Sequence, residues 1–299
     1  MINNHGYSQS ASRVERAQPH LGTLVKIAVE ALDESRAYAA VEIGFAAIAE
    51  VHRLMSFHEN TSDVARLNRD AWRGPTAIDP LTAQTLRLAL EISAASDGIF
   101  DITIAPHLVA SGLLPTPANA PVPDPQATWR DIEFTAPNCV RFKRAAWIDL
   151  GGIAKGFAVD HAIDQMALPG DAQCSVNAGG DLRVSGPASE RVLLRVPGHA
   201  PETVPTIDLT DGSIASSSRL MTSQQAAPLR GPHVHGVTRE CVGADEFAAV
   251  LAERCVVADA LTKVVLASGS ASAAILSRFG ATAYLHSQRH GWQSFGYEH

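Results

Sequence analysis

The sequence has 299 residues, of which 46% are hydrophobic and 18% are charged, and its formal net charge is −7. This is the composition of a globular protein with a large core, and the chain is long enough for one large domain or two closely associated lobes. The chain has no block of clustered lysine and arginine, which argues against a nucleic-acid-binding protein.

The cysteines and residues 1–20 argue against further classes of protein. The four cysteines are far apart and none lies in a Cys-x-x-Cys pair, which argues against a zinc knuckle. Residues 1–20 contain no apolar segment typical of a signal peptide and no lipobox-like cysteine, and we identify no membrane segment in the sequence. We therefore expect a cytoplasmic protein. Residues 1–18 show no periodicity and are expected to form a flexible tail.

The pattern after the tail predicts one strand and one long helix. Residues 22–30 alternate between apolar and polar side chains as a half-buried strand does. An apolar stripe at helical spacing follows Asp33, a favourable N-cap residue, and continues to Met55. We expect this helix to cover a sheet. A polar loop comes next and leads to a short helix capped by Ser62.

A third helix is predicted over residues 82–96, which are largely apolar. It stops at Asp97-Gly98, a dipeptide typical of turns. Residues 113–126 then include five prolines, so they predict an irregular connection. The length of this connection makes it a natural place for the chain to cross between two lobes.

The second half of the chain predicts short strands separated by turns. Strands at 139–142 and 145–150 lead to a helix from Ile153 to about Met166. A later helix is predicted at 273–279. Six further strands are predicted at residues 174–177, 182–186, 191–196, 206–209, 281–285 and 292–295.

Three segments in this half have weaker patterns. Asp211-Gly212 indicates a hairpin. Residues 213–219 and 231–236 are polar and are expected at the edges of loops. The residues after 244 permit two interpretations. Propensity favours a helix over 245–255, but residues 247–252 also fit a buried strand followed by a helix.

The motif that stands out is Asp149-Leu-Gly-Gly-Ile-Ala-Lys-Gly156, where a predicted strand gives way to a helix. A glycine turn at a helix start exposes backbone N–H groups at the positive end of the helix dipole, and such a turn binds phosphate. Lys155 would add a positive charge. The motif matches neither of the familiar nucleotide-binding fingerprints. The alternative is a helix start at which Gly152 and Gly156 permit close packing.

Two further segments lie where a strand gives way to a loop or a helix, Asn177-Ala-Gly-Gly-Asp181 and Asp259-Ala-Leu-Thr-Lys263. Glycines let a ligand approach the backbone without obstruction by a Cβ atom. Asp259 and Thr262 offer a carboxylate and a hydroxyl near a helix start, and such oxygen ligands suit magnesium bound to a diphosphate. Taken alone, an N-cap role for Asp259 and a helix-face hydroxyl for Thr262 are the simpler interpretation.

Taken in order, these segments resemble the ApbE family, the FAD:protein FMN transferases. The resemblance covers about residues 20–297 and is carried mainly by the motifs that begin at Asp149 and Asn177. The family has a strand just before its Ala-Asp-Ala segment, so the resemblance favours a strand at 247–252. The weaker matches are Leu21-Gly-Thr23, Met55-Ser-x5-Ser62-x5-Asn68, Asp97-Gly-Ile-Phe-Asp-Ile-Thr103 with Pro106, and Ala258-Asp-Ala-Leu-Thr262.

The resemblance implies a fold and a reaction. The implied fold is α+β and related to the T-fold: residues 19–299 would form one domain of two interleaved lobes, each a mainly antiparallel sheet with helices, and the ligand cleft would lie between the lobes. Family members bind FAD and Mg²⁺, transfer FMN to a Ser or Thr hydroxyl of an acceptor protein, and release AMP. Magnesium that bridges a diphosphate neutralises the charge that develops in phosphoryl transfer.

The resemblance also implies roles by position. The catalytic residues would be His233, as the base for the incoming hydroxyl, and Asp259. As a lone histidine, His233 could equally be a surface side chain, as could His235 beside it. The magnesium ligands would be the Gly152 carbonyl, Asp259 and Thr262. The residues expected to bind FAD are His58, Ile99, Phe100, Asp101, Asp149, Lys155, Asn177, Gly179, Gly180, Val234 and Lys263.

One departure from the family pattern bears on the metal. The family usually has a metal-binding Thr four residues after the Asp, where this chain has Lys263. Its ammonium would either touch the diphosphate in place of the cation or repel magnesium at short range. Two other functions stay open beside flavin transfer. One is an FAD-binding or storage protein, or a slow FAD diphosphatase, with no acceptor; the other is a structural interaction protein whose glycine turns serve packing.

Overall fold

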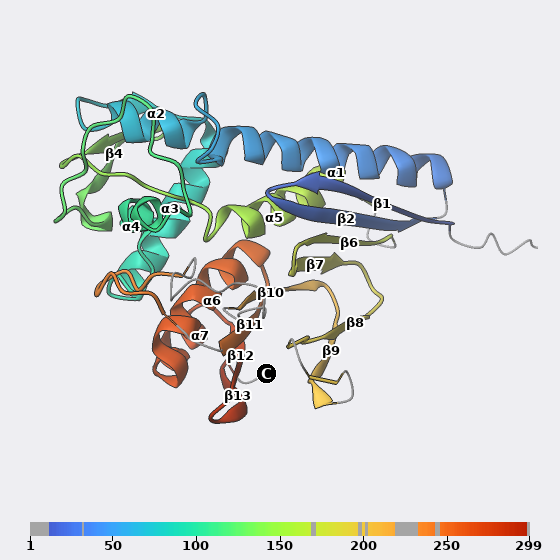
Figure 1. Cartoon of the computed structure of the whole chain (residues 1–299). Helices are drawn as coiled ribbons and strands as arrows, with labels where there is room; N and C mark the ends of the chain where they lie inside the picture. The colour runs from blue at the N-terminus through green and yellow to red at the C-terminus, as the bar shows by residue number, and fades with distance from the viewer. Residues whose placement is uncertain are drawn as a thin grey trace, which may run out of the picture.

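The fold is built around one antiparallel sheet of eight strands in the order β1-β2-β6-β7-β10-β11-β12-β13 (Figure 1). It is seen in a computed structural model that describes residues 12–31, 33–168, 172–196, 199–200, 203–218, 233–242 and 246–297. Every neighbouring pair in this sheet is antiparallel. The strands are β1 (Ser12–His20), β2 (Thr23–Ala31), β6 (Gln173–Ala178), β7 (Asp181–Ser185), β10 (Gly212–Ser218), β11 (Glu246–Ala252), β12 (Thr282–Ser287) and β13 (Gly291–Gly296).

Helices cover one face of this sheet. The long helix α1 (Glu34–Met55) lies along β1 and β2, α5 (Ala154–Met166) packs against β6 and β7, and α6 (Cys255–Ser268) packs against β10 and β11 (Figure 1). Asp33 caps α1, because its side chain accepts the N–H groups of Ser35 and Arg36. The helix predicted to begin after Asp33 and reach Met55 is therefore confirmed.

A smaller sheet and a second core lie on the opposite face. The strands β8 (Glu190–Leu193) and β9 (Thr206–Leu209) pair with each other there. Along β11, Phe247 and Ala249 enter this second core, whereas Ala248 and Val250 enter the main one. A strand buried on both faces reads as a continuous apolar run, which explains why residues 247–252 resembled a helix. The strand prediction is confirmed.

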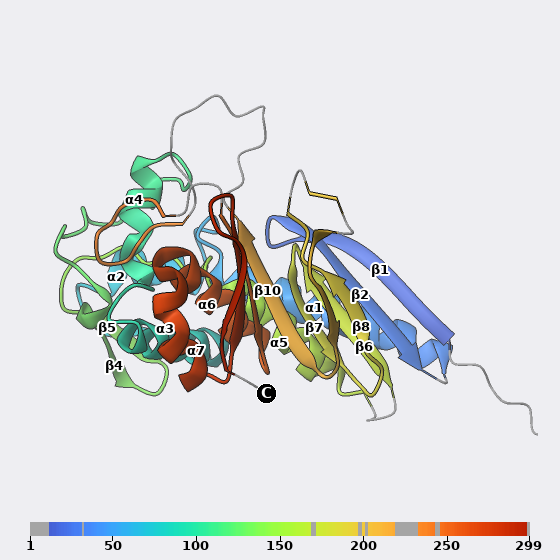
Figure 2. The same ribbon diagram turned by 90° about the horizontal axis from the view of Figure 1, so that it is seen from below.

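The second lobe, called the small lobe, comprises residues 56–142 and lies beside α6 and α7 (Ala273–Arg278) (Figure 2). The chain enters it after α1 and returns at α5, and residues 233–242 reach back to contact it. The two lobes are therefore interleaved, as expected. The small lobe contains α2 (Asp63–Asp70), α3 (Pro80–Ala95), η1 (Ile102–Ile104), α4 (Ala105–Ala110), η2 (Trp129–Asp131) and the sheet of β3 (Thr76–Ala77), β5 (Cys139–Phe142) and β4 (Ile132–Ala136).

The predicted tail is wrong in its last part. Residues 12–18 belong to β1, which pairs with β2 along its whole length. Val14 is the one buried residue of β1, and Glu15 forms ion pairs with Arg13 and Lys26. An edge strand with charged side chains can pair on one side with little apolar alternation, so its sequence resembles a tail. Residues 1–11 lie outside the described part of the chain.

The predicted strand at 145–150 is also wrong, because these residues join no sheet in the described structure. The side chain of Asn68 takes the place of a neighbouring strand. Its amide donates to the Ile148 carbonyl at 3.0 Å and its carbonyl accepts the Ile148 N–H at 2.7 Å. The N–H of Asp149 donates to the Ile102 carbonyl at 2.8 Å. Buried backbone groups need partners, and here they come from outside any sheet.

Of the polar residues 213–219 expected at a loop edge, residues 213–218 belong instead to the strand β10, and residue 219 lies outside the described part of the chain. Asp211-Gly212 is not a hairpin, because β9 pairs with β8 whereas β10 pairs with β7 and β11. The strand lies between two partners, so pairing on both edges stabilises it despite its serines. Three of its serines, Ser216, Ser217 and Ser218, line a cavity between the lobes.

One helical stretch, Cys255–Arg278, is long and apolar enough to cross a membrane by length and composition alone. It joins α6, η4 (Gly269–Ser272) and α7. Ten of the fourteen residues of α6 are buried, and the helix contacts β10, β11 and α5. A core helix of a globular protein passes the same test, and the packing of α6 makes it one.

The start of α6 depends on Asp160, a residue of α5. Its fully buried carboxylate accepts the N–H groups of Cys255 and Val256, each at 3.0 Å, and forms ion pairs with Arg183 and Arg254. Burial raises the pKa of Asp160, and these N–H groups and arginines oppose that effect. Asp160 is therefore an N-cap supplied from another helix.

We expect Asp160→Ala to lower the free energy of unfolding by about 3 kcal/mol or more, because it leaves two buried N–H groups without an acceptor and removes the buried carboxylate that Arg183 and Arg254 share. Urea unfolding would measure the loss. Asp164→Ala is the matched control, since Asp164 binds the same two arginines but is half exposed. It should cost less than about 1 kcal/mol. Equal losses in the two variants would contradict the capping role.

Candidate active site

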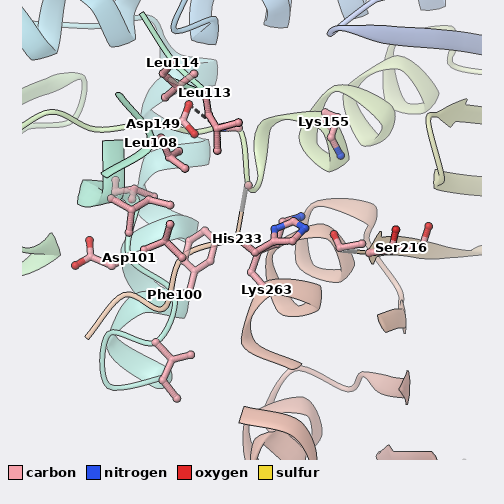
Figure 3. A pocket seen from close by; sticks show the side chains of 18 of the residues that line it. Phe100, Asp101, Leu108, Leu113, Leu114, Asp149, Lys155, Ser216, His233 and Lys263 are labelled. Carbon is pink, nitrogen blue, oxygen red and sulfur yellow. Dashed lines mark hydrogen bonds between the residues drawn. The ribbon is translucent and has the colours of Figure 1, made fainter. Parts of the chain in front are cut away.

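A cavity of about 490 Å³ lies between the two lobes (Figure 3). The small lobe gives it an apolar side with Phe100, Leu108 and Leu114. Cavities of this size with a few convergent polar groups are typical of small-molecule sites. The other side is polar and is formed by Asp149, Gly151, Gly152, Lys155, Gly179, Ser216, Ser217, Ser218, His233 and Lys263.

A second cavity of about 250 Å³ adjoins the first and shares Asp149, Gly151 and Lys155 with it. His58, expected to bind FAD, lines this second cavity. The structure therefore places His58 next to the main cavity and separates it from Phe100. The two cavities meet along the Asp149 turn.

The Asp149 turn is held from both sides. The Asp149 N–H is bound by the Ile102 carbonyl, and Oδ1 of Asp149 accepts the Gly151 N–H at 3.1 Å. Burial raises the pKa of Asp149, while the Gly151 N–H and the charge of His58 oppose this. Asp149 therefore shapes the turn that forms the boundary between the two cavities.

Four charged side chains meet below the polar side of the main cavity, and we call them the Lys–Asp cluster: Lys155, Asp181, Asp259 and Lys263. Lys155 forms an ion pair with Asp181 and its Nζ lies 3.8 Å from Oδ1 of Asp259. Lys263 binds the Asp259 carboxylate, and its Nζ also donates to the Asp259 carbonyl at 2.9 Å. Lys155 is at the start of α5, and Lys263 follows Asp259 by one turn of α6.

The lysines of the cluster are more exposed to the cavity than the aspartates are. Both aspartate side chains are 0% exposed, whereas Lys155 is 31% and Lys263 is 16% exposed. Both lysines line the cavity and neither aspartate does. The cluster therefore presents ammonium groups to a ligand and keeps the carboxylates behind them.

The charges of the cluster stabilise each other. Burial alone would lower the pKa of Lys155, but Asp259 and Asp181 raise it above its ordinary value. Burial would raise the pKa of Asp259, and the two lysines outweigh burial and lower it. Burial and the charge of Asp259 raise the pKa of Asp181. Lys155 therefore stays charged at neutral pH.

The expected magnesium ligands do not present a free set of oxygens. Oδ1 of Asp259 binds Lys263, and Oδ2 accepts the Gly156 N–H at 3.0 Å. The Thr262 hydroxyl is fully buried, donates to the Asp259 carbonyl at 2.7 Å and lies 2.9 Å from Oγ of Ser217. No group of three or more His, Cys, Asp or Glu that could hold a metal occurs among the described residues. As arranged, these side chains do not fit a divalent cation.

Two of the three glycines of the motif, Gly152 and Gly156, differ in what they do. At Gly156 a Cβ atom would lie 2.7 Å from the carbonyl carbon of Cys255 and 2.8 Å from Cβ of Asp259. Gly156 therefore lets α5 and α6 approach closely, as the packing interpretation of the motif predicts. Gly152 lines the cavity, and a Cβ there would meet Phe100 at 3.4 Å.

The Asn177 turn is also shaped by its own contacts. Oδ1 of Asn177 accepts the Gly180 N–H at 3.0 Å. Gly179 and Gly180 have φ angles of +67° and +104°, and a Cβ atom would lie 2.6 Å from a hydroxyl oxygen of Thr23 or Ser216 respectively. Of these three residues, Gly179 lines the cavity. The turn therefore requires glycine for its backbone and packing, whether or not a ligand binds.

His233 and Val234 line the cavity from a loop, residues 233–242, that folds back on itself through a bridge between Val234 and Cys241. Figure 3 shows His233 between Phe100 and Ser216 and above Lys263. Burial and the nearby charges of Lys263 and Lys155 lower the pKa of His233 to about 4, against the opposing effects of Asp259 and the Ser218 backbone. His233 is therefore neutral at pH 7 and able to accept a proton.

We expect the His233 ring to stay neutral at pH 6, and NMR titration of its ring protons would show this. Because the unfolded histidine binds protons from about pH 6.5 and the folded one only near pH 4, its contribution to stability is complete above about pH 6.5. It is lost as the pH falls towards 4. A titration midpoint near 6.5 would contradict the buried, cation-facing position of the ring.

Arg239 holds this loop against the small lobe, a role that the sequence analysis missed. Its Nη2 donates to Oδ2 of Asp101 at 2.9 Å, to Thr103 at 3.1 Å and to the Ala127 carbonyl at 3.3 Å. The Gly236 N–H donates to the Ile99 carbonyl at 2.9 Å. The Asp101 carboxylate is buried in these contacts and points away from Lys263 in Figure 3. Asp101 and Ile99 therefore border the cavity and anchor the loop.

We expect Arg239→Met to lower the free energy of unfolding by about 2–4 kcal/mol, because it leaves the buried Asp101 carboxylate without its cation. Chemical denaturation would measure this, and amide exchange at Gly236 should accelerate. In the double variant with Asp101→Asn the loss should shrink, since no unpaired charge remains. Additive losses in the two single variants would contradict the direct coupling.

Similarity to known proteins agrees with this architecture. Residues 21–285 match the model of the ApbE family. The chain is 25% identical over 231 residues to the FAD:protein FMN transferase of Klebsiella pneumoniae (strain 342), and 24% identical to that of Salmonella typhimurium. Each match covers 72% of this chain and 66% of the relative, slightly less than two thirds of its length.

Solved structures show the same fold. The ApbE protein of Thermotoga maritima superposes with a TM-score of 0.80 at 24% identity, covering 95% of this chain and 97% of the other. The flavin transferase ApbE of Vibrio cholerae superposes with a TM-score of 0.79 at 19% identity, covering 96% and 98%. The antiparallel α+β fold of the chain is therefore established beyond its own sequence pattern.

Proposed function

This chain belongs to the ApbE family, and we propose that it is a flavin transferase that moves FMN from FAD to a Ser or Thr hydroxyl of an acceptor protein. The observation that carries the proposal is the cavity between the lobes. Its polar side presents the ammonium groups of Lys155 and Lys263, and its apolar side presents Phe100. A diphosphate needs the first and a flavin ring fits the second. The related FAD:protein FMN transferases support the same substrate.

The reaction requires little covalent chemistry from the protein. The acceptor hydroxyl oxygen forms a bond to the FMN phosphorus, the bond from that phosphorus to the bridging oxygen breaks, and AMP leaves with the electron pair. Lys155 and Lys263 are placed to stabilise the negative charge on the diphosphate and on the departing AMP. In such transfers, positioning and electrostatic stabilisation supply most of the rate.

His233 is the base in this proposal. It lines the same cavity as the two lysines, and its pKa of about 4 leaves the ring neutral at pH 7 but makes it a weaker base than an ordinary histidine. The hydroxyl proton would pass to the free ring nitrogen of His233 and then to solvent. Proton transfer by a positioned histidine typically contributes 10²–10⁴-fold to a rate.

The alternative function is an FAD-binding protein or a slow FAD diphosphatase without an acceptor. The ion pairs within the Lys–Asp cluster support this alternative. Because Lys155 and Lys263 are already paired with carboxylates, less of their positive charge is available to stabilise a transfer reaction. In the diphosphatase, water would replace the acceptor hydroxyl and the products would be FMN and AMP.

One experiment distinguishes the transferase, the diphosphatase and the FAD-binding protein. The purified protein is incubated with FAD, with and without magnesium, and with an acceptor that carries a flavinylation-type Ser/Thr motif. The proposal predicts covalent flavin on the acceptor and an equal amount of AMP. AMP with free FMN would identify the diphosphatase, and FAD binding without AMP would identify the binding protein. A protein that binds no flavin would contradict all three.

A further inference from the structure

We propose that the ammonium of Lys263 occupies the place of a divalent cation in this chain, so that FAD binds through Lys263 and Lys155 without magnesium. The inference rests on FAD as the substrate in the proposed function. It concerns how the diphosphate is held, and it follows from the arrangement of the Lys–Asp cluster.

The oxygens of Asp259 are already bound by other groups of the protein. Lys263 binds Oδ1 of the carboxylate and, at 2.9 Å, the main-chain carbonyl of the same residue. Gly156 N–H holds Oδ2. The oxygens that would face a cation therefore already face one, and it is a side chain of the same helix. A divalent cation could bind only after Lys263 had been displaced from both oxygens.

Lys263, and not Asp259, faces the cavity. Asp259 is fully buried and does not line the cavity, whereas Lys263 does. The Lys263 stem passes Gly152, where a Cβ atom would lie 3.7 Å from Lys263 Cε. A ligand that enters the cavity beside Gly152 therefore meets the lysine before it meets the aspartate. A phosphate group accepts hydrogen bonds from an ammonium at such a site.

The charges of the Lys–Asp cluster also disfavour a divalent cation. Two lysines and two aspartates balance within the cluster, and Lys155 Nζ lies 3.8 Å from the same Asp259 oxygen that Lys263 binds. A divalent cation at Asp259 would approach both ammonium groups in a poorly solvated site, where like charges repel strongly. A diphosphate carries two negative charges and would be attracted to both.

The test is an equilibrium titration of FAD fluorescence with the intact protein, in excess EDTA and in millimolar magnesium. We expect the wild-type dissociation constant to differ by less than about twofold between the two conditions. Lys263→Thr removes the ammonium from Oδ1 and the main-chain carbonyl of Asp259 and adds a hydroxyl. Its affinity in EDTA should fall about tenfold, and magnesium should restore at least part of that loss.

Lys143→Met is the matched control, because Lys143 follows β5 directly, is half exposed and pairs with Glu133. Its titrations should match the wild type. Thermal unfolding of each variant verifies that it is folded. Wild-type binding that is lost in EDTA and regained with magnesium would overturn the inference and leave the flavin transferase intact. Unchanged affinity of Lys263→Thr in EDTA would also overturn it. Absence of FAD binding under every condition would instead contradict the proposed function.

Discussion

Gly156→Ala is expected to be among the most damaging single substitutions in this chain. A Cβ atom at this position would lie 2.7 Å from the Cys255 carbonyl carbon and 2.8 Å from Cβ of Asp259, and both are fixed parts of α6. Because these atoms cannot move independently, the helices α5 and α6 must separate. Such overpacking typically costs about 1–3 kcal/mol and occasionally more. We expect a loss at the upper end, measured by urea unfolding.

The same substitution should also disturb the site, because Gly156 N–H binds Oδ2 of Asp259. FAD affinity should therefore fall together with stability. Gly74→Ala is the control, since a Cβ atom at Gly74 meets no atom within 4 Å. It should leave both quantities unchanged. If Gly156→Ala were as stable as the control, the close contact between α5 and α6 would be wrong.

His233→Ala is expected to have the largest effect on transfer itself. The rate of FMN transfer should fall about 10²-fold or more, because the hydroxyl would lose its base. FAD affinity should stay within about threefold of the wild type, since the lysines hold the diphosphate. Single-turnover formation of covalent flavin and a separate fluorescence titration would measure the two effects.

Two further variants make this result specific. His233→Gln keeps a hydrogen-bonding side chain beside the Ser218 backbone but cannot act as a base near neutral pH, so it should be as slow as His233→Ala. His290→Ala removes an exposed histidine from the turn between β12 and β13 and should be fully active. A transfer rate in His233→Gln within about threefold of the wild type would remove His233 from the mechanism.

Much of the fold could be predicted because its signals are local. The Asp33 cap and the apolar stripe defined α1, and Ser62 defined the start of α2. Strand β5 was predicted with its observed bounds. Propensity did not distinguish a strand from a helix at β11. A strand that is buried on both faces lacks the alternation of apolar and polar residues by which strands are identified. The family resemblance gave the correct answer there.

The errors share a physical cause, which is that the stabilising partner lies far away in sequence. The segment 145–150 is extended because Asn68, some eighty residues earlier, binds its backbone. The polar strand β10 exists because β7 and β11 pair with both of its edges. The residues 12–18 pair with β2 although only Val14 is buried. No pattern within these segments contains that information.

The candidate site was predictable as a set of residues but not in its electrostatics. The structure brings Phe100, Asp149, Lys155, His233 and Lys263 to one cavity. It places Asn177, Asp259 and Thr262 outside the lining of that cavity and His58 in the adjoining one. Arg239 was missed, because an isolated arginine in a loop gives no signal until the buried carboxylate of Asp101 is seen beside it.

A crystal structure of the protein with FAD would test the central claim most directly. We expect the diphosphate in the cavity between the lobes, with oxygens within about 3.2 Å of the Nζ atoms of Lys155 and Lys263, and the flavin ring against Phe100. FAD bound elsewhere, or a diphosphate in this cavity that touches neither ammonium, would contradict it.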